Sequence, residues 1–283
     1  MTLSRSLVSW LYISPLMLVL IPFFVLPILV VLVASVFETD GFGGLIPTLT
    51  LANYANVLTS SLTFNLYFET VKFTVLTWFF TLFLGFFVAY FLAFHVKNQL
   101  LAIGLFLICT VPFWTSNIIR MISWIPLLGK EGLINSALLH LGLIHEPLGF
   151  LLYSSFAVVV AYVHQLTIFM VVPIFNSMAR IDKRIVEAAF DVGASRFDIM
   201  RLIIVPLSKS GIALGSIFVV SIVMGDFFVT KVMSGGGSAS VVGAFYEDIS
   251  VLQYPGAAAS AVVLTLVLMA TISLILRTVD IRK

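Results

Sequence analysis

Charged residues are scarce in this chain, and this scarcity indicates whether the protein is water-soluble or embedded in a membrane. Only 10% of the 283 residues are Asp, Glu, Lys or Arg, whereas 61% are hydrophobic and the mean hydropathy is +1.16. A water-soluble protein of this length needs more charge to cover its surface, so the composition excludes that class. The net charge of +2 gives no indication of a nucleic-acid partner. The composition is that of an integral membrane protein.

Residues for redox and metal chemistry are few as well. The single cysteine, Cys109, rules out a disulfide within the chain. Four histidines are scattered without the spacing of metal ligands, and they are His95, His140, His145 and His164. We therefore expect no metal site, and we expect these histidines to form structural hydrogen bonds.

A nucleotide-binding loop is also missing. The P-loop pattern needs a glycine five positions before its Gly-Lys pair, followed by Ser or Thr. Here Gly129-Lys130 is followed by Glu131, and Trp124 stands where the first glycine is needed. No catalytic motif replaces it. We expect a protein that is not an enzyme and holds no cofactor, so any ATP that drives it must be bound by a partner.

Long apolar segments dominate what is present. Each is close to or above the ~20 residues that cross a bilayer as a helix, and they are 10–37, 68–95, 100–119, 151–175, 207–229 and 255–276. They are too long, and lack the alternation, for strands of a membrane β-barrel. The first is too long for a signal-peptide core, so we expect it to stay as an uncleaved anchor. The sequence predicts an all-α membrane protein of about six spans, forming one transmembrane domain over residues 1–283.

Basic residues predict the orientation of these spans. If both termini are cytoplasmic, eleven of the fifteen Lys and Arg residues lie inside, namely Arg5, Lys97, Arg180, Lys183, Arg184, Arg196, Arg201, Lys209, Arg277, Arg282 and Lys283. Cytoplasmic loops carry such an excess of positive charge. We therefore expect cytoplasmic termini and outer loops at about 38–67, 120–150 and 230–254. Lys72 and Arg120 stand at span edges, from where their side chains are expected to reach the interface.

The cytoplasmic loop at about 177–206 is polar and prone to form helices. Asp182 is suited to cap a helix, and Gly193 is suited to end or bend it. Ser195 is suited to cap a second helix, with Asp198 as a shorter version of the capping-box acid. The loop is therefore predicted to be two short helices joined at a glycine.

The first of these helices has a narrow face of small and apolar residues, formed by Ile185, Ala188, Ala189 and Val192. Such a face suits docking into a groove of a partner protein. A surface helix lying along the lipid headgroups is the alternative, and spacing by itself does not separate the two.

The stretch EAAFDVGASRFDIMRLIIVP resembles the EAA loop of membrane subunits of binding-protein-dependent ABC importers. The family pattern has Glu-Ala-Ala, a glycine, and Ile-x-Leu-Pro, and the matching residues are Glu187, Ala188, Ala189, Gly193, Ile203 and Pro206. Val205 stands where the pattern has Leu, which is a conservative change. Residues 111–144 and 224–236 are similar to the polyamine-type branch, and the likeness covers about residues 10 to 277.

This resemblance implies a fold, a role and a set of partners. It implies the type I ABC importer permease fold in a bacterial inner membrane. Two ATP-binding subunits would bind ATP and Mg, a second permease of a related chain would complete the path, and an outer solute-binding protein would deliver the solute. The loop would act as the coupling helix that contacts the ATPase, with its role carried by Glu187, Ala188, Ala189 and Gly193 and flanked by Asp191.

A charge inside a span is costly and therefore marks a candidate functional site. Asp226 lies late in the fifth apolar segment, where its carboxylate would balance the charge of a passing cation. An internal salt bridge with Lys72 or Lys231 explains the same residue equally well.

Aromatic residues are further candidates for the solute path. The rings of Trp114, Trp124 and Tyr162 are suited to stack on amine or methylene groups. An aromatic belt at the outer interface is the alternative, above all for the two tryptophans.

The resemblance favours a polyamine or a related small cation as cargo, and it leaves phosphonates, other organic amines and metal complexes as alternatives. A secondary transporter driven by an ion gradient is a different class. That class is expected to show internal pseudo-symmetry and paired discontinuous helices, and the two halves of this sequence show no convincing repeat.

Overall fold

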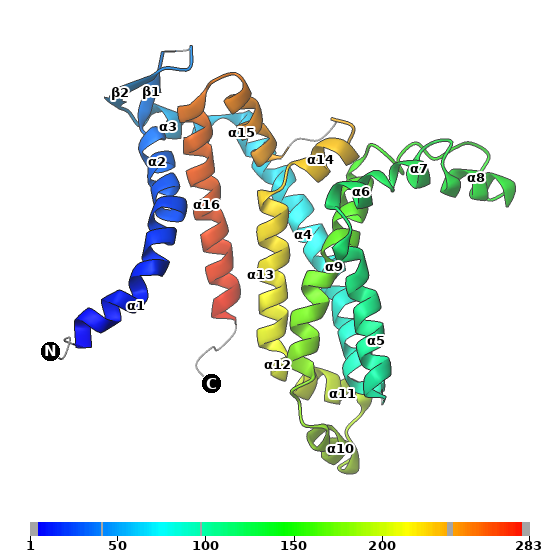
Figure 1. Cartoon of the computed structure of the whole chain (residues 1–283). Helices are drawn as coiled ribbons and strands as arrows, with labels where there is room; N and C mark the ends of the chain where they lie inside the picture. The colour runs from blue at the N-terminus through cyan, green and yellow to red at the C-terminus, as the bar shows by residue number, and fades with distance from the viewer. Residues whose placement is uncertain (1–4, 41, 97, 237–239, 279–283) are drawn as a thin grey trace. The chain divides into compact units, whose positions relative to one another are not determined.

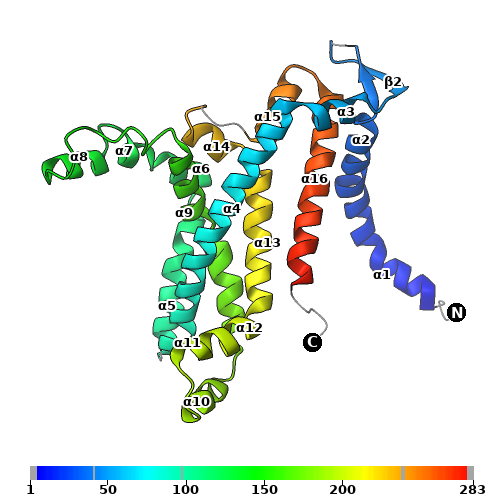
Figure 2. The same ribbon diagram turned by 180° about the vertical axis from the view of Figure 1, so that it is seen from behind.

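The computed structural model describes residues 5–40, 42–96, 98–236 and 240–278, and these are mainly helical (Figures 1 and 2). Lys97, Arg282 and Lys283, which contribute to the predicted orientation, lie outside the described residues. The contacts group the chain into two compact units, one of Met1–Phe64 with Ala244–Val267 and one of Asn65–Gly243 with Leu268–Lys283. The expectation of a single transmembrane domain stays a prediction.

The first unit is built from apolar helices and a small hairpin. Its elements are α1 (Arg5–Leu20), η1 (Ile21–Val25), α2 (Leu26–Ala34), β1 (Phe37–Thr39), β2 (Leu45–Leu49) and α3 (Ala52–Thr59), with most of α15 (Val241–Ser250) and α16 (Tyr254–Arg277). The strands β1 and β2 pair antiparallel. The apolar run Tyr12–Ala34 has 23 residues. A helix of that length is about 35 Å long, enough to cross the hydrocarbon core.

The second unit is a helical bundle. Its elements are most of α4 (Ser61–Tyr90), then η2 (Phe91–His95), α5 (Gln99–Thr110), η3 (Val111–Trp114), α6 (Asn117–Ile122), α7 (Ile125–Leu128), α8 (Leu133–His140), α9 (Ser155–Met178), α10 (Lys183–Asp191), α11 (Arg196–Ile199), η4 (Met200–Ile204), α12 (Val205–Leu207), α13 (Lys209–Gly225) and α14 (Phe228–Met233). In both views α4, α5, α9 and α13 lie side by side.

Small residues let α13 approach α9 closely. A Cβ atom on Gly211 would lie 2.4 Å from the carbonyl oxygen of Pro173, and one on Gly215 would lie 2.7 Å from the sulfur of Met170. Small residues four positions apart are a common basis of helix packing in membranes. Nearby, the indole nitrogen of Trp78 donates to the hydroxyl of Ser216 at 2.8 Å, which ties α4 to α13.

The number of spans is where structure and sequence differ. The described residues contain four helices long and apolar enough to cross a membrane, Tyr12–Ala34, Ser61–His95, Ser155–Met178 and Tyr254–Arg277. A fifth is present if Arg196–Leu207 and Lys209–Gly225, which meet at a bend of 67°, are taken as one span. The all-α membrane fold is confirmed.

The third predicted segment, 100–119, is not one continuous helix. The helix α5 has 12 residues and ends at Thr110, after which η3 forms a tight turn. Ser116 then has non-helical backbone angles, with φ −56° and ψ 136°, before α6 begins at Asn117. Twelve helical residues span about 18 Å, less than the hydrocarbon core, so apolar composition predicted a longer helix than the backbone forms here.

Candidate functional site

The loop after α9 forms the helix that its sequence predicts. The carboxylate of Asp182 accepts a hydrogen bond from the backbone nitrogen of Arg184 at 3.0 Å, and α10 begins at Lys183. The cap satisfies one of the free N–H groups at the start of the helix. The predicted start of this helix is therefore confirmed.

The end of α10 is a glycine-dependent turn. Gly193 has a φ of +87°, and its backbone nitrogen donates to the carbonyl of Phe190 at 2.9 Å. The nitrogen of Ala194 donates to the carbonyl of Ala189 at 3.0 Å, which completes a Schellman motif. No atom lies within 4 Å of where a Cβ of Gly193 would be. The position therefore requires glycine for its backbone conformation and not for lack of space.

A capping box starts the second short helix. The backbone nitrogen of Asp198 donates to the hydroxyl of Ser195 at 3.1 Å, and the Asp198 carboxylate accepts from the backbone nitrogen of Ser195 at 3.3 Å. This reciprocal pair is the predicted one. Both ends of α10 and the start of α11 are thus capped, and the loop continues through η4 and α12 into α13.

The outer surface of α10 is uncovered in this chain. No residue of α10 is buried, and the exposed fractions are 47% for both Ile185 and Phe190. Val192, just after the helix, is 84% exposed. Glu187, Ala188 and Asp191 are exposed as well.

The predicted apolar face of α10 is split between two sides. Ala189 packs with Val186 against the core of the unit, whereas Ile185, Ala188 and Val192 are exposed. The single face predicted from spacing was therefore wrong in one member, because helical spacing does not say which edge of an apolar stripe the rest of the protein covers.

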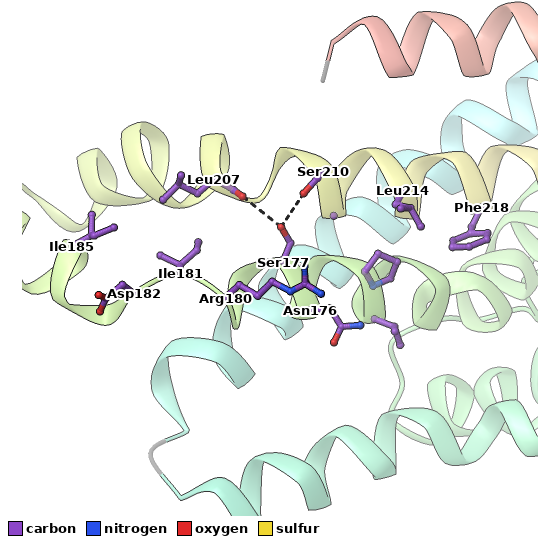
Figure 3. A pocket seen from close by; sticks show the side chains of 13 residues that line it. Asn176, Ser177, Arg180, Ile181, Asp182, Ile185, Leu207, Ser210, Leu214 and Phe218 are labelled. Atoms are coloured by element: carbon purple, nitrogen blue, oxygen red, sulfur yellow. Dashed lines mark hydrogen bonds between the residues drawn. The ribbon is translucent and has the colours of Figure 1, made fainter. Parts of the chain in front are cut away.

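A groove of about 780 Å³ lies at the base of this loop (Figure 3). It is bordered by the end of α9, by the segment leading into α10, and by α13. The hydroxyl of Ser177 lies between the two walls, 3.4 Å from the carbonyl oxygen of Leu207 and 3.3 Å from the hydroxyl of Ser210. A smaller hollow of about 250 Å³ lies on the other side of α10, and Glu187 lines it together with Lys183 and Arg196.

Asp226 lies just after the end of α13 and is held by hydrogen bonds. Its Oδ1 atom accepts from the hydroxyl of Tyr162 at 3.0 Å and from the backbone nitrogen of Val229 at 2.9 Å. Tyr162 is only 1% exposed, and its hydroxyl also lies 3.1 Å from that of Thr230. The structure therefore brings together two predicted path residues. It adds Thr230, which no local pattern singled out, because its hydroxyl meets that of Tyr162 from 68 positions away in the chain.

Lys72, one of the two lysines considered as a salt-bridge partner of Asp226, is paired with another residue. Lys72 forms an ion pair with Glu69, one turn earlier on α4. Two hydrogen bonds from neutral groups, the Tyr162 hydroxyl and the Val229 backbone nitrogen, help to position the Asp226 carboxylate. It is half-buried and not sealed within the core.

The two predicted tryptophans lie apart from the Asp226 pair. The indole nitrogen of Trp124 donates to Nδ1 of His164 at 3.1 Å. Trp114 is 86% exposed. Among the described residues, hydrogen bonds therefore join Tyr162 to Asp226 and Trp124 to His164, and the four predicted path residues do not form one cluster.

Arg120 is a residue that sequence reasoning placed wrongly. It was expected to extend to the interface, but its side chain is only 7% exposed and its guanidinium donates to the side chain of Asn117. A charged residue at the end of an apolar run gave no signal that α6, which contains it, would pack against α9. Among the described residues, no group of three His, Cys, Asp or Glu side chains is placed to hold a metal ion.

Comparisons with known proteins show what the whole chain is similar to. No family model matches the chain. It is 32% identical over 254 residues to the spermidine/putrescine transport system permease protein PotB of Salmonella typhimurium, covering 88% of this chain and 86% of that protein. It is 30% identical over 224 residues to PotB of Haemophilus influenzae, covering 79% and 77% of the two chains.

A solved structure shares the fold. A chain of a bacterial alginate ABC transporter, solved in complex with an alginate pentasaccharide-bound periplasmic protein, aligns with a TM-score of 0.75. The alignment covers 96% of this chain and 93% of that one at 14% identity, a level that supports the fold alone.

Proposed function

Because this chain belongs to the family of ABC transporter permeases that includes the PotB proteins, we propose that it carries a polyamine or a related small cation across the inner membrane. ATP bound to partner subunits drives this transport. The observation that carries the proposal is α10, a helix with both ends fixed and its outer surface uncovered.

The loop is suited to transmit movement to the spans. Caps at Asp182 and Gly193 keep both ends of α10 helical. A displacement of α10 by a partner is therefore transmitted to the rest of the loop, because the ends of the helix do not unwind. The chain then runs through α11, η4 and α12 into α13, with a bend of 67° at the entry to α13. Since α13 packs tightly on α9 at Gly211, a displaced α13 must carry α9 with it or slide along it.

The partners follow from this role. Two ATP-binding subunits hold ATP and Mg and contact α10 through the residues of the EAA loop, Glu187, Ala188, Ala189, Asp191 and Gly193. A second, related permease completes the path, and a solute-binding protein delivers the cargo on the outer side. Both termini are cytoplasmic in this arrangement. A partner groove is the better cover for α10 than the lipid surface, since Glu187 and Asp191 balance Lys183 and Arg184 and leave the helix no excess of positive charge to hold it on anionic headgroups.

The cargo proposal rests on Asp226 and on the named substrates of the PotB relatives. A half-buried carboxylate is a counter-charge for an ammonium group, and two hydrogen bonds keep it in place. Trp114, which is exposed, and Trp124, which is half-buried, are secondary candidates for stacking on the cation. The ring of Tyr162 is buried, so Tyr162 contributes to the path by positioning the carboxylate of Asp226.

The test is uptake by proteoliposomes that contain this permease with its permease and ATPase partners. With binding protein and labelled putrescine or spermidine outside, we expect uptake that requires ATP inside. Uptake that continues without ATP and follows an ion gradient would mean a secondary transporter. ATP-driven uptake of a phosphonate or a metal complex, with none of either polyamine, would disprove the cargo and keep the coupling.

A further inference from the structure

Arg120 is a buried positive charge with no counter-ion in the described part of the chain. Its side chain is 7% exposed, and one guanidinium nitrogen donates to the amide oxygen of Asn117. The Nε–H group is buried with no acceptor, and no carboxylate of the described residues lies within ion-pair distance. A buried charge in a membrane protein costs free energy unless an opposite charge or hydrogen-bond acceptors compensate it. The guanidinium of Arg120 therefore lacks a negatively charged partner among the residues described.

A pocket of about 190 Å³ adjoins Arg120 between α4, α5 and α9. Besides Arg120 it is lined by Val88, Cys109, Phe113, His164, Thr167, Ile168 and Val171. One water molecule occupies about 30 Å³ in the liquid, so the pocket has room for a small ion or a carboxylate group. Val88, Thr167 and Val171 are interior residues of helices long enough to cross the membrane, which places the pocket away from the lipid headgroups.

The polar groups at this pocket are mainly donors. Nδ1 of His164 accepts the indole N–H of Trp124, so a neutral His164 carries its proton on Nε2. The Arg120 side chain lines the pocket and carries a buried Nε–H without an acceptor among the described residues. Thr167 donates its own hydroxyl to the carbonyl of Val163 at 2.6 Å and is already paired. Donors without a matching acceptor call for an oxygen-bearing anion.

We propose that this pocket binds a small anionic group of carboxylate or phosphate chemistry, whose oxygens accept hydrogen bonds from Arg120 and His164. The site goes beyond the proposed cargo, because a polyamine carries only positive charge and Arg120 repels it. The site is also distinct from Asp226. Residues two positions apart on an α-helix are rotated by about 200° around its axis, so Tyr162 and His164 face opposite sides of α9.

The site can be tested through Trp124, whose indole contacts His164. The purified complex of the permease with its partner subunits is titrated with acetate and with inorganic phosphate, while sodium chloride keeps the ionic strength constant. We expect a saturable change in tryptophan fluorescence and a rise in Tm. Arg120→Gln should raise the apparent Kd at least about tenfold, which equals 1.4 kcal/mol of binding free energy. Arg120→Lys should raise it less, since an ammonium keeps the charge without the planar fork.

Two control variants make the result specific. Trp124→Phe should remove the fluorescence signal and keep a shift in Tm, because Arg120 still binds the anion; the shift should be smaller than in the wild type, since His164 loses the indole N–H that keeps its proton on Nε2. Lys72→Gln removes a charge from another apolar helix, one already paired with Glu69, and should leave the affinity for both anions unchanged.

Three results would overturn the proposal. One is a response that is equal in the wild type and in Arg120→Gln. Another is no saturable binding of either anion to the wild type. The third is loss of the second permease from the Arg120→Gln complex while the wild type binds no anion, which would assign a partner carboxylate to the pocket. Polyamine uptake measured on the same preparations keeps this outcome separate from the proposed function, since uptake can persist when anion binding fails.

Discussion

The hydroxyl of Tyr162 donates a hydrogen bond to Oδ1 of Asp226 across 3.0 Å, joining the middle of α9 to the end of α13. Because Tyr162 is buried and Asp226 is half-buried, the bond fixes the carboxylate of a residue that remains partly open. The same carboxylate oxygen also accepts from the backbone of Val229 at the start of α14. One side chain therefore organises the junction at which α13 ends.

Asp226→Asn should separate the charge of this residue from its structural role. Asparagine keeps an oxygen that accepts from Tyr162, so the junction should persist while the negative charge is lost. We expect polyamine uptake to fall about tenfold, mainly through a higher KM, with little change in Tm. The measurement is the concentration dependence of uptake into proteoliposomes.

Tyr162→Phe is the matched control for this charge. It removes the hydrogen bond and keeps both the ring and the carboxylate, so stability should fall by about 1 kcal/mol with a smaller effect on uptake. If Asp226→Asn transports at the wild-type rate, Asp226 is a structural residue and the cation path lies elsewhere.

Gly193 should prove essential for its backbone conformation. Its φ of +87° is strained for residues with a Cβ atom, and least so for asparagine. Gly193→Val should cost about 1–2 kcal/mol locally, unwind the end of α10 and lower uptake at least about tenfold. ATP hydrolysis should continue without transport. The ratio of ATP hydrolysed to solute imported, measured in proteoliposomes, reports this uncoupling.

Gly193→Asn controls for the size of the side chain. The space around this position is open, so asparagine should keep most of the transport activity. Equal coupling in the valine and wild-type proteins would show that the turn at Gly193 is dispensable.

Reversing the charge of Glu187 should weaken the contact with the ATPase. Glu187 is exposed and lies four residues after Lys183, so lysine at this position places two like charges on adjacent turns. That repulsion costs only about 0.2–0.5 kcal/mol within the helix, too little to unfold it. We expect Glu187→Lys to reduce co-purification of the ATP-binding subunits, whereas Glu187→Gln should retain them. Full retention by the lysine variant would argue against this surface as the contact.

Local features of the fold could be predicted from the sequence, and features made by distant residues could not. Asp182, Ser195 and Gly193 act on backbone groups within a few positions of themselves, so their roles follow from spacing. The pairing of Asp226 with Tyr162 joins residues 64 positions apart, and sequence reasoning named both without joining them. The burial of Arg120 depends on how α6 lies against α9, which no local pattern records.

The close packing of α13 on α9 gives a prediction about stability. A Cβ atom on Gly211 would lie 2.4 Å from the backbone oxygen of Pro173 and 2.7 Å from Cβ of Ser177, and a backbone atom cannot swing away as a flexible side chain can. Gly211→Ala must therefore push the two helices apart. We expect a loss of about 1–3 kcal/mol, measured as a lower Tm and a lower midpoint of denaturation for the purified protein.

Gly104→Ala distinguishes this steric effect from the general preference of helices for alanine. Gly104 lies inside α5 with no atom within 4 Å of the added Cβ, so the substitution should be neutral or stabilise by up to about 1 kcal/mol. If both variants change the Tm equally, the helices are not in close contact at Gly211. A lower Tm in Gly211→Ala alone, accompanied by loss of transport, would support the route by which movement of the EAA loop reaches α9, since that route requires α13 and α9 to move as a packed pair.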